Sequence, residues 1–131
     1  MIKSVVIKTV GPKQMRYRTV GDWQLLPTGE LEITVADTGN WIYNLLVAIH
    51  ELIEVFLCQI DGVSGKQVDR FDFAHQNDED PGTHPKAPYH DQHCTALGVE
   101  LLLAARAGVK WRKYEDRLDT VYAKIPKRNK H

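Results

Sequence analysis

The sequence has little cysteine, no excess of charge of either sign and no long apolar run, and each absence excludes a class of protein. Cys58 and Cys94 are the only two cysteines, too few for a disulfide-stapled fold. We interpret both as reduced, buried thiols of an intracellular, cytoplasmic protein, with a metal-ligand role for one of them as the alternative. Lys plus Arg equals Asp plus Glu at 17 each, so nucleic acid is not an expected partner. No segment reaches the roughly 18 uninterrupted apolar residues of a membrane span, and the N-terminus lacks a signal-peptide pattern.

The chain that is left is of ordinary composition, and its first part is rich in strand patterns. With 131 residues, 43% of them hydrophobic, we expect one domain: a sheet over 1–37, a helical part over 38–125 and a flexible basic tail over 126–131. Four short segments, separated by turn residues, predict an antiparallel β-meander: SVVIKTV, QMRYRTV, DWQLL and ELEITVA. In the last of them apolar and polar residues alternate, as in a half-buried strand that can lie at a sheet edge.

Helix signals dominate the rest of the sequence. A long helix is predicted from Trp41 to Ile60, capped by Thr38 or Asn40 and ended by Asp61 and Gly62. A capping box predicts a short helix from Ser64, and residues 74–88 read as a polar loop. A second long helix is expected from Pro88 to Ala107, and a C-terminal helix follows from Trp111 up to Pro126. Strands followed by helices indicate an α+β fold.

The stretch LLVAIHELIEVFLCQ, residues 45–59, places three ionisable residues in an otherwise apolar helix. His50 and Glu54 are one turn apart and lie side by side, and Glu51 falls in the same sector of the helix. A charge buried on such a helix is costly unless it is paired or binds a metal. A histidine nitrogen and a carboxylate at this spacing can ligate one ion.

The second long helix carries a matching stripe. His93 and Glu100 are two turns apart and share a face with small neighbours, which would allow two helices to approach closely. His50, Glu54 and His93 together give two imidazoles and one carboxylate, a ligand set typical of catalytic zinc with one position left for water. Glu51 stands where a general base could activate that water. Glu100 is either a fourth ligand or the acceptor of the free N–H of a ligating histidine.

The motif HELIE, residues 50–54, resembles the H-E-x-x-H helix of zincin metallopeptidases, with Glu in place of the second His. The resemblance covers roughly residues 30–105 and also extends to small uncharacterised phage and prophage proteins with an H-E-x-x-E helix. It implies a zincin-like fold, His50 as the first ligand, Glu51 as the general base, a third ligand from a later helix, and an edge strand that pairs with the substrate. Position 54 departs from the family pattern, which leaves the second ligand and the identity of the metal open.

These observations predict a zincin-like metal-dependent hydrolase, with zinc or another divalent ion between the two long helices and Glu51 activating water. The expected substrate is an extended peptide laid along the strand Leu31–Ala36. Tyr89 is a candidate oxyanion donor, and QNDEDPG, residues 76–82, is interpreted as a solvated loop that could act as a lid.

Four alternatives stay open at this level. One is a phosphohydrolase using Mg²⁺ or Mn²⁺, with Glu100 as a ligand. Another is a phage-type interaction or inhibitor protein that binds a host protein, with a structural metal or none; a closed four-ligand site would favour it, and an open three-ligand site beside a cleft would favour catalysis. The last two need no metal: a solvent-facing stripe on the helix, or a buried polar network of His and Glu.

Overall fold

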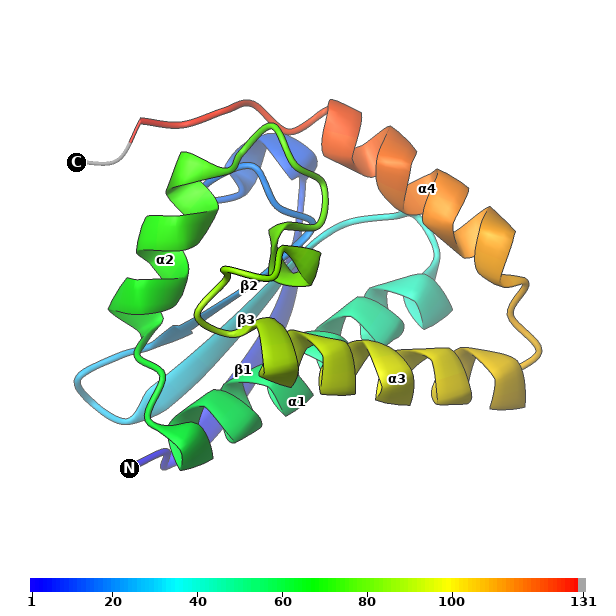
Figure 1. Cartoon of the computed structure of the whole chain (residues 1–131). Helices are drawn as coiled ribbons and strands as arrows, with labels where there is room; N and C mark the ends of the chain where they lie inside the picture. Colours follow the sequence, from blue (N-terminus) through cyan, green and yellow to red (C-terminus); the bar gives the residue numbers. More distant parts are fainter. Residues whose placement is uncertain (130–131) are drawn as a thin grey trace.

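The N-terminal part of the chain forms a three-stranded mixed sheet in the computed structural model, which describes residues 1–129. Its strands are β1 (Ser4–Val10), β2 (Gly21–Leu25) and β3 (Glu30–Ala36). The spatial order is β1-β3-β2, with β1 parallel and β2 antiparallel to β3 (Figure 1). The predicted antiparallel pairing of DWQLL with ELEITVA is therefore confirmed. The meander is wrong for β1, which lies parallel to β3 instead of next to β2.

The segment predicted as a second strand, QMRYRTV, is not a strand. Its first residue, Gln14, ends a short 3-10 helix, η1 (Pro12–Gln14), and the rest crosses to the far side of β3 before β2 begins. Arg16 is held by side-chain bonds instead of a strand ladder: its guanidinium donates to both oxygens of Asp22 and of Asp69 over 2.8–2.9 Å. Such bidentate ion pairs fix the direction of the chain as well as contributing energy. A β-like composition could not distinguish this crossing from a hairpin.

Helices make up the remainder, which confirms the α+β class. They are α1 (Trp41–Asp61), α2 (Gly65–Ala74), the 3-10 helix η2 (Pro81–Thr83), α3 (His90–Arg106) and α4 (Trp111–Ala123). The side chain of Asn40 caps α1 by accepting hydrogen bonds from the N–H groups of Ile42 and Tyr43. Gly62, with φ of 74°, ends α1 in the left-handed conformation that favours glycine. The predicted capping and ending signals of α1 are thus confirmed.

Helix α1 packs against β2 and β3 and also against α3 (Figure 1). The alternation predicted for β3 is confirmed, since Leu31, Ile33 and Val35 are fully buried in the main core. However, β3 is the central strand and is hydrogen-bonded on both sides. It has no free edge for an added strand, so the expectation that a peptide pairs with Leu31–Ala36 is wrong.

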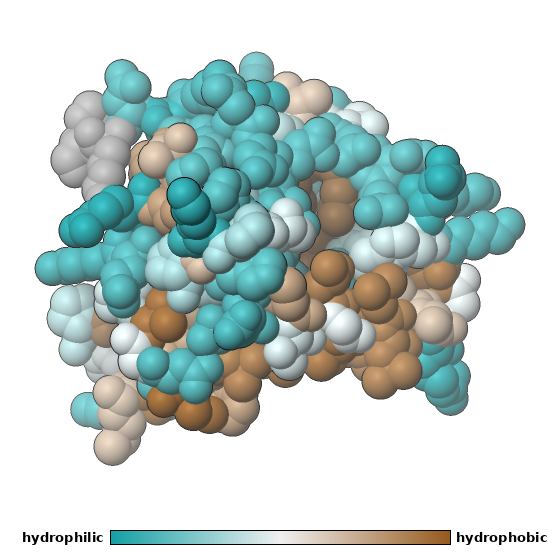
Figure 2. All heavy atoms as spheres, in the orientation of Figure 1, coloured by the Kyte–Doolittle hydropathy of each residue, from teal (hydrophilic) through white to brown (hydrophobic). Residues whose placement is uncertain are grey.

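Several large apolar side chains stay exposed. On α1 they include Trp41 at 72%, Phe56 at 57% and Ile60 at 65% exposure, and on α3 Leu102 at 69%. Figure 2 shows hydrophobic residues gathered along the lower part of one face, over the region of α1 and α3. Among residues 1–129, α1 is long and apolar enough to cross a bilayer by length and composition. One face of α1 packs against the sheet and α3, and 44% of its apolar window is buried.

Two further predictions concern the cysteines and the C-terminal tail. Cys58 is buried as predicted, whereas Cys94, which was also predicted to be buried, is exposed on α3. The tail expected to be flexible is hydrogen-bonded as far as Arg128, whose backbone N–H and carbonyl both pair with the Gln76 side chain. Lys130 and His131, the end of that tail, lie outside the described residues.

Candidate metal centre

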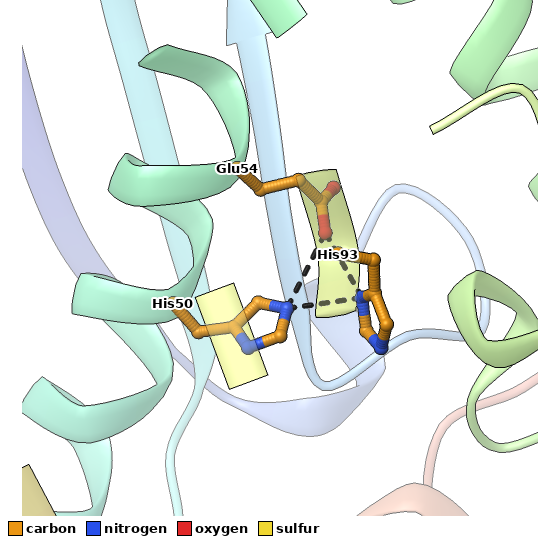
Figure 3. Close-up of side chains that lie close together, drawn as sticks. All are labelled: His50, Glu54 and His93. Atoms are coloured by element: carbon orange, nitrogen blue, oxygen red, sulfur yellow. Dashed lines mark hydrogen bonds and ion pairs between the residues drawn. The ribbon is translucent and has the colours of Figure 1, made fainter. Parts of the chain in front are cut away.

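His50, Glu54 and His93 form a buried triangle between α1 and α3 (Figure 3). His50 Nε2 lies 3.1 Å from His93 Nδ1 and 3.3 Å from Glu54 Oε2. His93 Nδ1 lies 3.0 Å from the same Glu54 oxygen. All three residues are less than 8% exposed, with values of 7%, 4% and 7%. The structure therefore brings these three predicted residues together and excludes a solvent-facing stripe.

The size of the triangle suits a tetrahedral ion. Ligand atoms at zinc bond lengths of about 2.0–2.1 Å are separated by about 3.3–3.4 Å along a tetrahedral edge. The observed separations of 3.0–3.3 Å are within a few tenths of an ångström of that edge. His50, Glu54 and His93 could thus hold a zinc ion as three ligands from one side.

Small residues bring the ligands into place. Ala96 and Ala104 are buried on α3, which lets this helix lie close to α1. Gly82 in η2 lies against the His93 ring: a Cβ added there would be 2.3 Å from its Cγ and 2.5 Å from Nδ1. Only a residue without a side chain can stand at position 82 with His93 in this rotamer.

Glu100 contacts the other nitrogen of His50. Its Oε1 lies 2.7 Å from His50 Nδ1, and its Oε2 accepts a hydrogen bond of 2.6 Å from the Tyr114 hydroxyl on α4. A proton on Nδ1 leaves the lone pair of Nε2, in a neutral imidazole, free to face a cation. Of the two roles expected for Glu100, the geometry matches the acceptor role, because the carboxylate lies on the far side of the ring from the triangle.

The other two ligands are held in similar ways. The Trp23 indole on β2 donates to Glu54 Oε1 over 3.3 Å, which leaves Oε2 directed into the triangle. Asp80 Oδ1 lies 2.8 Å from His93 Nε2, within ion-pair distance but not aligned for a hydrogen bond. Partners of this kind orient metal-binding side chains and raise the basicity of the imidazoles.

Without a bound cation, the carboxylates of the cluster favour the protonated, positively charged form of both histidines. Burial lowers the pKa of His50, but hydrogen bonds to Glu100 and Glu54 outweigh it and raise this pKa to about 11. His93 behaves alike, with burial opposed by Asp80 and Glu54, and its pKa rises to about 10. For Glu54, burial is outweighed by the two histidines, which lower its pKa to about 2. Binding of a metal would therefore release protons.

A cavity of about 210 Å³ opens beside the triangle. In Figure 2 its mouth lies in the hollow between α4 and the η2 segment. Glu51 reaches into it, and among residues 1–129 nothing hydrogen-bonds to this carboxyl group. Burial and the charge of Glu54 raise the pKa of Glu51, against the opposing effect of His50. Gly21 on β2 packs against Glu51, since a Cβ there would be 3.0 Å from its Cγ.

Sequence reasoning missed several residues that shape the site. Trp23 was predicted only as part of a strand, Tyr114 as part of the C-terminal helix, and Asp80 and Gly82 only as part of a solvated loop. No local signal distinguishes them, because each reaches the cluster only through the tertiary fold. Tyr89, considered as an oxyanion donor, gives its hydroxyl hydrogen to Asp72, which also accepts from Tyr17 over 2.7 Å.

Comparisons of the chain with family models, with curated proteins and with solved structures gave no match.

Proposed function

We propose that the protein is a metal-dependent hydrolase in which His50, Glu54 and His93 hold a zinc ion and Glu51 acts as the general base. The observation that supports this most directly is the triangle itself: three ligand atoms 3.0–3.3 Å apart, open on one side to a cavity. When bound, the zinc ion would lower the pKa of a water molecule and polarise a carbonyl group.

The surrounding side chains hold the ligands in position and supply the general base. Glu100 and Tyr114 hold His50 by its far nitrogen, and Trp23 holds one oxygen of Glu54. Glu51 is adjacent to the first ligand in sequence, faces the cavity and has no competing hydrogen bond among the described residues. It is therefore placed to take a proton from water and return it to a leaving group. An amide in a peptide suits this chemistry, and the zincin resemblance of HELIE supports that substrate class.

Two alternatives from the sequence fit the site less well. A Mg²⁺ or Mn²⁺ phosphohydrolase needs a carboxylate-rich set of ligands, whereas the triangle has two imidazoles and one carboxylate. An inhibitor with a structural metal would be expected to have a closed site with four ligands. Glu100 does not complete such a site, because it contacts His50 Nδ1, the nitrogen that faces away from the triangle. In the remaining alternative, the same residues form a buried polar network without a metal. The experiment below distinguishes this network from a metal site.

The test is elemental analysis of protein purified without a metal-affinity tag, for the wild type and for His50→Ala and His93→Ala. We expect one zinc ion per chain, lost in both variants and kept in His84→Ala, which removes a histidine outside the triangle. Wild-type protein that binds no divalent ion with micromolar or better affinity would contradict the proposal.

A second measurement assigns the role of Glu51. We expect Glu51→Gln to keep the zinc ion and to lose hydrolysis of a mixed peptide library by about 10²–10⁴-fold, the usual contribution of a general base. Cleavage is followed by mass spectrometry. Loss of zinc from this variant would instead make Glu51 a ligand.

A further inference from the structure

We propose that the substrate carries a cationic group on an apolar stem, as in a lysine or arginine side chain, and that the outer part of the cavity receives it. This inference deepens the proposed function and rests on it. The supporting observations are the carboxylates of the cavity wall, the absence of lysine and arginine from the described residues that line it, and apolar side chains that line the same cavity.

Acidic residues extend from the metal site to the mouth of the cavity. Beyond Glu51, Glu54 and Glu100 the lining includes Glu79, Asp80, Glu115 and Asp119. Of these four, Asp80 is at the His93 ring, whereas the other three carry exposed carboxylates. No lysine or arginine of the described chain is among the lining residues.

The positive charge near the outer carboxylates is already engaged elsewhere. His50 and His93 are paired with Glu100, Glu54 and Asp80. The charge of Arg18 lowers the pKa of Glu79. However, the Arg18 guanidinium lies 4.3 Å from the centroid of the Tyr122 ring and donates to the Tyr122 carbonyl. The neighbouring Asp119 carboxylate, with some burial, raises the pKa of Glu79 to about 7. A nearby like charge has this effect on a carboxyl group, so the raised pKa indicates local excess negative charge. A bound cation would relieve it, whereas a phosphate ester would be repelled.

The apolar surface accounts for the stem. Trp111 and Leu118 on α4 and Leu97 on α3 line the same cavity, and on α4 they alternate with Glu115 and Asp119. The methylene groups of lysine or arginine pack on such surfaces while the charged end stays in a polar, solvated place. A half-buried tryptophan also offers its ring face to a cation.

The test uses three probes that share a metal-binding group and differ in the side chain. They are the α-hydroxamates of Nα-acetyl-lysine, Nα-acetyl-norleucine and Nα-acetyl-glutamate, and the lysine probe keeps its charged ε-ammonium group. Affinity for zinc-loaded protein is measured by calorimetry. We expect the lysine probe to bind about 10-fold more tightly than the norleucine probe, since each exposed charge pair contributes a factor of a few. The glutamate probe should bind weakest, and the preference should shrink as salt is added.

Matched variants of α4 locate the effect. Asp119→Asn should reduce the lysine-to-norleucine ratio several-fold, whereas Asp116→Asn removes the same charge from the same helix outside the cavity and should leave the ratio unchanged. Both positions are exposed, so neither change should affect folding. An equal effect of the two variants would overturn the assignment of the cationic group to the cavity.

The corresponding amides, which cannot bind a metal, are titrated into metal-free protein and followed by NMR. A stronger response to the lysine amide supports the inference whatever the outcome for zinc. Equal responses to the lysine and norleucine amides, or none, would overturn it. Hydroxamates that bind no better than amides would contradict the proposed metal site alone.

Discussion

At the scale of single residues, the site depends on which atoms of each side chain are already engaged. His50 faces the triangle with Nε2 because Glu100 occupies its Nδ1, and His93 faces it with Nδ1 because Asp80 lies at its Nε2. Helical spacing in the sequence was enough to predict that His50, Glu54 and His93 converge. It could not predict Asp80 or Tyr114, since neither shares a helix face with a ligand.

Gly82→Ala tests how tightly the His93 ring is held. The added Cβ would overlap the ring, so His93 must turn away from the triangle. We expect zinc affinity to fall by about 10–100-fold, comparable to the loss of a supporting partner, as measured by competition with a chromogenic chelator.

The matched control for this variant is Gly98→Ala on α3, where nothing lies within 4 Å of the new Cβ. This change should leave zinc affinity unaltered and stabilise the helix by about 0.5–1 kcal/mol. Equal zinc affinities of the two variants would show that the contact of Gly82 with His93 is not important for the site.

Glu100→Gln tests the partner of His50. The amide can still accept a hydrogen bond from Nδ1, but it loses the negative charge that favours a basic imidazole. We expect zinc affinity to fall by about 10-fold or more, with a smaller effect from Tyr114→Phe, which only frees one oxygen of Glu100. Complete loss of zinc in Glu100→Gln, with Tyr114→Phe unchanged, would instead indicate that Glu100 is a ligand.

At the scale of elements, helices were predictable, whereas strand pairing was predictable only for β2 and β3. The ends of α1 are set by local chemistry, Asn40 before it and Gly62 after it, and both signals are readable in a short window. The partner of a strand is set by distant residues: Arg16 directs the crossing through Asp22 and Asp69, and the last of these is 53 positions away. An antiparallel neighbour was the natural expectation for β1, but nothing local excluded the parallel one.

Asn40→Ala tests the importance of the start of α1, which carries two of the three ligands. Loss of both cap hydrogen bonds should reduce the free energy of unfolding by about 1 kcal/mol, measured by urea denaturation. Asn40→Asp keeps an acceptor at the same place and should be close to the wild type. Equal destabilisation in the two variants would point to another role for the asparagine amide group.

At the scale of the whole molecule, buried acidic groups link stability to pH. Asp72 joins α2 to Tyr17 and Tyr89, and its pKa rises to about 7, mainly through burial and against the two tyrosine hydrogen bonds. A raised pKa in the folded state means that the folded protein holds this proton more tightly than the unfolded chain does. The associated stability is present below about pH 4 and is lost as the pH rises through 7.

Asp72→Asn should therefore flatten part of the pH dependence of unfolding. We expect the stability of the wild type, relative to the variant, to fall by about 2 kcal/mol between pH 5 and pH 8. Urea denaturation in the presence of a chelator measures this difference without a contribution from metal. A difference that is constant across this range, or that grows in the opposite direction, would mean that Asp72 keeps an ordinary pKa.

The position of the triangle has a further consequence for the chain as a polymer. His50 and His93 are 43 residues apart in sequence, so an ion held by both would act as a reversible cross-link that closes a large loop. In the chain-entropy view, such a closure disfavours the unfolded chain much as a disulfide does. A reducing compartment, where cystine bridges do not last, would leave this fastening intact, and the lifetime of the protein against proteases would then follow the supply of metal.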